Sequence, residues 1–200
     1  MAFKYAIALT GGIASGKSSV GAYFRTLGWE VLNADKVAHT MLNRHANEIA
    51  SLFGKEMLHN GKIDRQALGA QVFRDKEKRK RLESFLHPLI YEALLDEANR
   101  LDEKRVPYLI ELPLFFETNR YPIERSLLVY VPKEVQLSRL MQRDALSKEE
   151  AKLRLDAQMD IELKRQKATY VIENLGTKEA LYQSVEALKH QLEGVLNDRY

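Results

Sequence analysis

A glycine-rich segment near the start of the chain has the residue types and spacing of a phosphate-binding loop. Residues 11–18 read Gly-Gly-Ile-Ala-Ser-Gly-Lys-Ser, which is a glycine, four residues, and then glycine, lysine and serine. The glycines let successive backbone N–H groups turn inward around a phosphate, and the N-terminus of a following helix favours the same negative charge. We expect Lys17 to reach the β- and γ-phosphates of a nucleoside triphosphate and the Ser18 hydroxyl to bind Mg²⁺.

The alternative is a glycine-rich turn that binds nothing. At average residue frequencies, on the order of one in a hundred chains of this length would contain such a match by accident. Here, however, the match follows an apolar run at residues 3–9 and precedes apolar residues at helical spacing, closed by Gly28. This strand–loop–helix context is the one that a phosphate-binding loop requires, so we favour nucleotide binding.

Two carboxylates stand where predicted strands end. Asp35 follows a strand expected at residues 29–33, and Glu111 ends a strand expected at residues 108–112. Open parallel sheets bind ligands outside the carboxyl ends of their strands. Asp35 could accept a proton from an attacking hydroxyl or hold a metal through water, or it could cap the helix that starts near Lys36. Glu111 is the best internal candidate for supporting Mg²⁺, and the alternative is a solvated loop residue.

Two arginines, Arg139 and Arg143, are four residues apart on one face of a helix expected after the fourth strand. A guanidinium group that closes over a transferring phosphoryl group stabilises its developing charge. The alternative for Arg143 is an ordinary solvated helix face.

Five short apolar runs predict an α/β fold with a five-stranded parallel sheet. The first run, the helix after it and the second run form a βαβ unit, which favours parallel pairing. The runs cover residues 3–9, 29–33, 108–112, 127–131 and 170–172. Residues 36–105 are mostly helical and charged without a convincing core strand, and we interpret them as a lobe inserted after the second strand. Within this lobe Asn60-Gly61 predicts a turn, Asp64 could cap the helix after it, and His87-Pro88 is expected to separate two helices. In the charged helical segment after the fourth run, Ser147 and Glu150 predict a capping box.

Composition excludes several classes of protein. With 31 basic and 28 acidic side chains, the net charge of +3 does not indicate a nucleic-acid partner. The chain has no cysteine, which excludes disulfides and thiolate metal sites. No apolar run approaches the roughly 20 residues of a membrane span, and the first residues lack a signal-peptide pattern. We expect a cytoplasmic protein without a membrane partner.

Taken together, the motifs resemble those of the dephospho-coenzyme A kinase family of the P-loop NTPase superfamily, over nearly the whole chain. The phosphate-binding loop alone indicates only the superfamily, and the ordered set of motifs selects the family. The matching segments are Leu9–Ser18, Ala34-Asp35, Asn60–Arg65, Leu86–Pro88, Pro113–Glu117, Gln136 with Arg139 and Arg143, Gln158, and Tyr170–Asn174.

This resemblance implies a three-layer P-loop kinase fold with a nucleotide-binding core of residues 1–35, 106–143 and 168–200. It further implies an acceptor-binding helical lobe at 36–105 and a helical lid at 144–167. The implied reaction transfers the γ-phosphate of ATP, with Mg²⁺, to the 3′-hydroxyl of the ribose of dephospho-CoA, which is the last step of coenzyme A synthesis. The implied protein is a monomer or weak homo-oligomer.

The resemblance also assigns roles to individual residues. Asp35 would be the general base, with Lys17 and Arg143 as charge stabilisers. Asn174 would lie near the adenine, and ATP would contact Gly11, Gly12, Ile13, Ala14, Ser15, Gly16, Lys17, Ser18 and Ser19. The acceptor would contact Asp35, Arg65, His87 and Arg139, and the metal would contact Ser18 and Glu111.

Two residues depart from the family pattern. Ala14 stands where the family usually has glycine, so we expect this position to keep a negative φ. Glu111 replaces a common aspartate, which lengthens the side chain by one methylene. Two other functions stay open: a P-loop kinase for another small molecule or a nucleoside monophosphate, and a nucleotide-dependent switch. The chain lacks the asparagine–lysine–x–aspartate motif that selects guanine, which argues against a GTPase switch.

Overall fold

The computed structural model describes residues 3–197, with side chains described as far as Gly194, and divides into two compact units. The core unit comprises residues 3–32 and 98–197, and the helical unit comprises Asn33–Glu97. Residues 1–2 and 198–200, which the sequence assigned to the nucleotide-binding core, lie outside the described residues.

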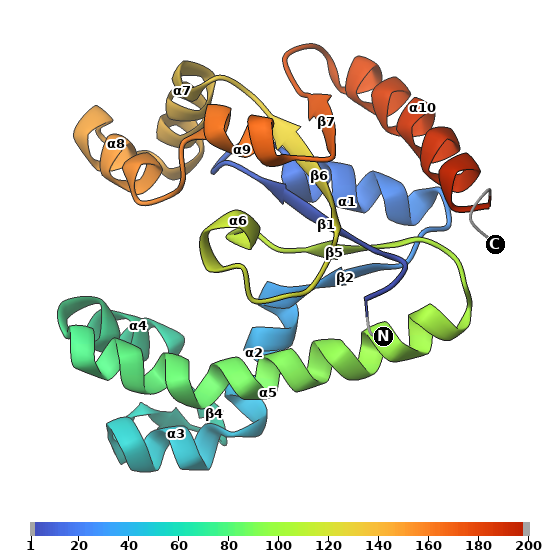
Figure 1. Ribbon diagram of the computed structural model, residues 1–200. Coiled ribbons are helices and arrows are strands. Elements are labelled where there is room, and N and C mark those ends of the chain that lie inside the picture. The colour runs from blue at the N-terminus through green and yellow to red at the C-terminus, as the bar shows by residue number, and fades with distance from the viewer. Residues whose placement is uncertain (1–2, 198–200) are drawn as a thin grey trace. The chain divides into compact units, whose positions relative to one another are not determined.

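The core unit is built on a five-stranded parallel sheet with the strand order β2-β5-β1-β6-β7 (Figure 1). The strands are β1 (Ala6–Gly11), β2 (Val31–Asn33), β5 (Tyr108–Glu111), β6 (Arg125–Tyr130) and β7 (Tyr170–Glu173). The predicted α/β class and parallel sheet are therefore confirmed. The bounds differ most at the first two strands, because β1 begins at Ala6 instead of Phe3 and β2 at Val31 instead of Trp29.

The core unit has three layers, with helices on both sides of the sheet, and the side chains of β6 pack alternately on the two sides. Leu127 and Val129 pack on one side with residues of α1 (Lys17–Thr26) and α10 (Lys178–Asn197). Leu128 and Tyr130 pack on the other side with Ile161, the first residue of α9 (Ile161–Lys167). Successive side chains of a strand point to opposite faces, so the apolar part of β6, residues 127–130, is buried on both. Figure 1 shows α1 and α10 beside one another and α9 on the opposite side of β6.

Three further helices follow strand ends in the core unit: α6 (Phe115–Thr118) after β5, and α7 (Lys133–Asp144) and α8 (Lys148–Asp156) after β6. Ser147 begins α8 with the predicted capping box: its hydroxyl accepts from the Glu150 N–H, and the Glu150 carboxylate accepts from the Ser147 N–H. Of these helices, α7 and α8 pack against Ile13 and Ala14 of the phosphate-binding loop.

The helical unit has its own apolar core and one small hairpin. Its core includes Met41, Ile49, Phe53 and Leu68. Its elements are α2 (Ala34–Arg44), α3 (Ala46–Phe53), the 3-10 turn η1 (Lys55–Met57), β3 (Leu58–His59), β4 (Lys62–Ile63), α4 (Arg65–Arg74) and most of α5 (Lys76–Glu103). The predicted Asn60-Gly61 turn is confirmed and joins β3 to β4.

The expected break at His87-Pro88 is wrong. Pro88 lies inside the continuous 28-residue helix α5. A proline in a helix removes one backbone hydrogen bond, here the one to the carbonyl of Ser84, and disfavours the helix by about 3 kcal/mol. Burial of Leu86, Leu94 and Ala98 along the same helix offsets that cost, so tertiary packing overrides the local signal. Within the described residues, none of the helices is both long and apolar enough to cross a bilayer.

Candidate active site

The phosphate-binding loop lies between β1 and α1. Gly16 adopts φ 91°, and its carbonyl accepts from the N–H groups of Ser19 and Val20, so α1 begins immediately at Lys17. The backbone of Ser15 closes a turn with the Gly12 carbonyl at 3.2 Å. The side chains of Ser18 and Ser19 are exposed on the first turn of α1. The arrangement offers backbone N–H groups, a helix N-terminus and a hydroxyl to an anion with its counter-cation.

Asn174 and Arg139 brace this loop. The Asn174 amide, just after β7, donates to the Ser15 carbonyl at 2.9 Å, and a side chain at Gly16 would overlap the amide. Arg139 of α7 donates to the Asn174 carbonyl at 2.8 Å. The structure therefore joins two sequence-predicted site residues to the loop itself. Contact of Asn174 with adenine and of Arg139 with the acceptor stay predictions.

The backbone angle φ of Ala14 differs from the one expected from the sequence. Its φ is 58°, in the left-handed region, instead of the negative value that we expected. An L-residue with a Cβ pays about 1–2 kcal/mol for this conformation, which glycine adopts freely. Ala14 and Ile13 are partly buried against Leu140, Ala151 and other apolar residues of α7, α8 and the turn between them. This packing holds the loop in its geometry despite the strained angle.

Lys17 and Glu111 form the charged centre of the site. Lys17 Nζ donates to Glu111 Oε2 at 3.1 Å, and Arg25 Nη2 donates to Glu111 Oε1 at 2.9 Å. The Glu111 side chain is 2% exposed, against 13% for Lys17 and 38% for Arg25. A buried carboxylate between two cations fixes the direction of both. Glu111 thus positions the loop lysine at the end of β5.

Sequence reasoning missed Arg25 and the space that Glu111 needs. Arg25 is eight residues after Lys17 on α1, so both lie on one helix face. Gly21 lies between them, and a Cβ there would be 2.7 Å from Glu111 Oε1. A glycine inside an amphipathic helix, flanked by two cations at helical spacing, was the signal that could have revealed this buried carboxylate.

Arg143 lies near the C-terminus of α7 and pairs with its neighbour. Its Nε and Nη2 donate to the two oxygens of Asp144 at 2.7 and 3.0 Å, and Arg154 of α8 donates to the same carboxylate at 3.1 Å. Hydrogen bonding to Arg143 lowers the pKa of Asp144 and raises that of Arg143. Arg143 is 56% exposed, so a phosphoryl group can compete with Asp144 for it.

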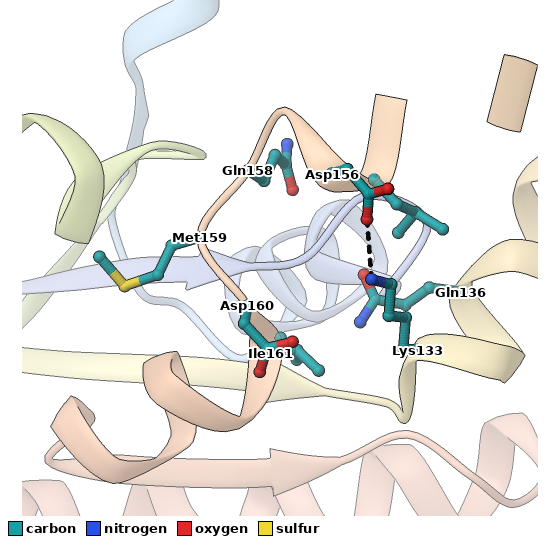
Figure 2. A pocket seen from close by; sticks show the side chains of 8 residues that line it. Lys133, Gln136, Asp156, Gln158, Met159, Asp160 and Ile161 are labelled. Carbon is teal, nitrogen blue, oxygen red and sulfur yellow. Dashed lines mark hydrogen bonds and ion pairs between the residues drawn. The ribbon is translucent and has the colours of Figure 1, made fainter. Parts of the chain in front are cut away.

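Two glutamines from α7 and the α8–α9 turn complete the surroundings of the loop. Gln158 Oε1 accepts from the Ile13 N–H at 3.0 Å, and Gln136 donates to the Val131 carbonyl while packing against Gly12. Both line a cavity of about 220 Å³, which Figure 2 shows together with the ion pair of Lys133 and Asp156 at 2.7 Å. The loop is thus held along its whole length by side chains from distant segments.

The helical unit carries Asp35, Arg65 and His87. The alternative role of Asp35 as a helix cap is wrong, because Asn33 caps α2 by accepting from the Lys36 N–H at 2.9 Å. Asp35 is exposed in the first turn of α2 and makes no hydrogen bond or ion pair within the described residues. Arg65 begins α4 after the predicted cap Asp64, which the structure confirms, and His87 is partly buried in α5.

A divalent cation fits the loop through Ser18. No group of three or more aspartate, glutamate or histidine side chains that could hold a metal ion occurs in the described part of the chain. Both oxygens of Glu111 already face cations, so direct ligation by Glu111 would displace Lys17 or Arg25. The exposed Ser18 hydroxyl, together with phosphate oxygens, is the hard oxygen donor set that suits such an ion.

Comparison with known proteins identifies the family. The family model for dephospho-CoA kinase matches residues 5–179. The chain belongs to the dephospho-CoA kinase family. A dephospho-CoA kinase of Wolinella succinogenes is 47% identical over 186 residues, covering 92% of each chain. A structure of dephospho-CoA kinase from Campylobacter jejuni has a TM-score of 0.75 at 37% identity, covering 96% of this chain and all of its own.

A crystal structure of TT1252 from Thermus thermophilus has a TM-score of 0.79 at 39% identity, covering 94% of this chain and 97% of that one. The predicted membership in the dephospho-CoA kinase family and the predicted P-loop kinase fold are therefore confirmed. Membership in this family implies ATP as a substrate and is consistent with a divalent cation, and the phosphate-binding loop described above suits both.

Proposed function

We propose that this chain transfers the γ-phosphoryl group of ATP to the 3′-hydroxyl of the ribose of dephospho-CoA, giving coenzyme A and ADP. The observation that carries the proposal is Lys17, held by the buried Glu111 carboxylate at the N-terminus of α1 in a complete phosphate-binding loop. Membership in the dephospho-CoA kinase family supports this acceptor and does not favour another small-molecule or nucleoside monophosphate kinase.

In the proposed mechanism the loop amides and Lys17 bind the β- and γ-phosphates, and Arg143 leaves Asp144 to meet the charge that develops on the transferring group. Asp35 takes the proton of the 3′-hydroxyl as general base. Mg²⁺ would supply charge neutralisation between the phosphates, with Ser18 as its ligand and Glu111 supporting it indirectly through the position of Lys17.

The remaining assignments belong to the same proposal. Asn174 would lie near the adenine, while Arg65, His87 and Arg139 would bind the acceptor. Residues 36–105 would form the acceptor-binding lobe and residues 144–167 the lid. We further propose that the protein acts in the cytoplasm as a monomer or weak homo-oligomer.

A coupled assay for ADP over a panel of acceptors tests the function. We expect turnover with dephospho-CoA and none with shikimate or a nucleoside monophosphate, and the reverse pattern would refute the proposal. Lys17→Ala should abolish transfer. Asp35→Asn should lower kcat by about 10² to 10⁴ while leaving ATP binding nearly unchanged. Glu83→Gln, an exposed carboxylate of α5, is the matched control and should keep wild-type kcat.

A further inference from the structure

A buried ion pair joins two side chains to which no individual role has been assigned so far. Lys164 of α9 is 0% exposed, and its Nζ lies 2.7 Å from Oε1 of Glu117 on α6, which is 18% exposed. Apart from this pair, Lys164 Nζ has no hydrogen-bond partner among the described residues, and neither does the buried Oε2 of Glu117. Such a pair is poor evidence for stability, because desolvation of two charges offsets much of their attraction. We therefore looked for a role of this pair in positioning neighbouring segments.

The pair holds the turn between α8 and α9. Glu117 Oε1 accepts from the Met159 N–H at 3.0 Å as well as facing Lys164. Figure 2 shows Met159 and its neighbour Gln158 on this turn. One carboxylate oxygen therefore ties the turn to the helix that follows it and to the segment after β5. Backbone atoms of a turn that are bound in this way lose most of their freedom to shift.

The same turn reaches the phosphate-binding loop. Gln158, adjacent to Met159, accepts from the Ile13 N–H at 3.0 Å. Ile13 precedes Ala14, which has a left-handed backbone and packs against apolar residues of α7 and α8. A continuous set of contacts thus runs from Lys164 through Glu117, the Met159 backbone and Gln158 into the first half of the loop.

We propose that Glu117 and Lys164 are positioning residues that preorganise the phosphate-binding loop for ATP by fixing Gln158 against Ile13. The proposal deepens the proposed function, on which it rests for the identity of the nucleotide. It assigns the two residues no contact with ATP. Their effect passes through Gln158, which makes the proposal separable from a merely stabilising role.

The test uses an apolar replacement of the pair, Glu117→Leu with Lys164→Met. Replacing both charges with side chains of similar size should leave the melting temperature within a few degrees of wild type. The dissociation constant for ATP, measured by calorimetry without acceptor, should rise about tenfold. If the pair only stabilised the fold, the double variant would keep both the stability and the ATP affinity of wild type, and this result would overturn the proposal.

Gln158→Ala supplies the second arm. It should raise the ATP dissociation constant by a similar factor with little change in melting temperature, and an unchanged constant would overturn the proposal even if the double variant failed to fold. Adding Gln158→Ala to the double variant should cost less than a further twofold, because both act through one contact. Independent effects, which would multiply to about a hundredfold, would refute the route through Gln158.

Two controls complete the design. Glu30→Gln with Lys104→Met removes an exposed ion pair of 3.2 Å and should leave ATP binding unchanged. Since ATP binding is measured without acceptor, failure of dephospho-CoA to react would refute the proposed acceptor alone. A normal reaction combined with normal ATP affinity in the variants would refute the positioning role alone.

Discussion

Replacement of Glu111 by glutamine tests the charged centre of the site. The substitution keeps the shape of the side chain but removes the charge that Lys17 and Arg25 share. Loss of one partner from a buried ion pair typically costs 3–5 kcal/mol, because an uncompensated charge stays buried. Here the cations left behind are 13% and 38% exposed, so water partly compensates them, and we expect the lower value of about 2–3 kcal/mol.

Thermal unfolding followed by circular dichroism measures this cost. For a chain of about 200 residues, 1 kcal/mol shifts the melting temperature by about 2–4 °C, so Glu111→Gln should melt about 4–12 °C below wild type. The matched control is Glu30→Gln, which removes the charge from an exposed pair with Lys104 and should stay within about 1–2 °C. If the two variants melt alike, the Glu111 carboxylate does not anchor Lys17 and Arg25 in the way described.

Three further predictions concern the loop and its helices. Ala14→Gly should raise the melting temperature by about 1–4 °C, because it relieves the left-handed strain, whereas Ala22→Gly, at an exposed position of α1, should lower it by a similar amount. Gly21→Ala should destabilise by about 1–3 kcal/mol, measured by urea unfolding, since its Cβ would be 2.7 Å from the buried carboxylate. Because the pKa of Asp144 is lowered in the folded protein, its bond to Arg143 stabilises the fold fully above pH ~4, the usual pKa of an aspartate. This stabilisation is lost as the pH falls through the pKa of Asp144 in the folded state. The difference in melting temperature between wild type and Asp144→Asn should therefore vanish in acid.

The features that sequence predicted well are those determined by neighbours in the chain. The phosphate-binding loop is a contiguous motif, and the capping box at Ser147 depends on four consecutive residues. Buried parallel strands such as β6 show as short apolar runs, because both faces need apolar side chains. The turn at Asn60-Gly61 likewise follows from two residues that tolerate positive φ.

The features that sequence did not predict depend on distant contacts. Pro88 is a local helix breaker, yet α5 continues because apolar residues on both sides of it are buried. Ala14 has a positive φ because side chains from α7 and α8 confine it, and no local rule contains that confinement. The partners of Glu111 lie on α1, 94 and 86 residues earlier in the chain, so a carboxylate predicted to support a metal has both oxygens engaged by cations.

The loop sequence supplies groups suited to a phosphate, but other parts of the chain supply their directions. Asn174 bonds to Ser15 across 159 residues, Gln158 bonds to Ile13 across 145, and Glu111 bonds to Lys17 across 94. Each bond fixes a backbone or side-chain group whose misplacement would weaken phosphate binding, and preorganisation of this kind avoids reorganisation when ATP arrives. The loop motif can therefore occur in many proteins, while the distant residues that hold it determine how well it binds. Substitutions at those residues should accordingly change ATP affinity more than they change the fold.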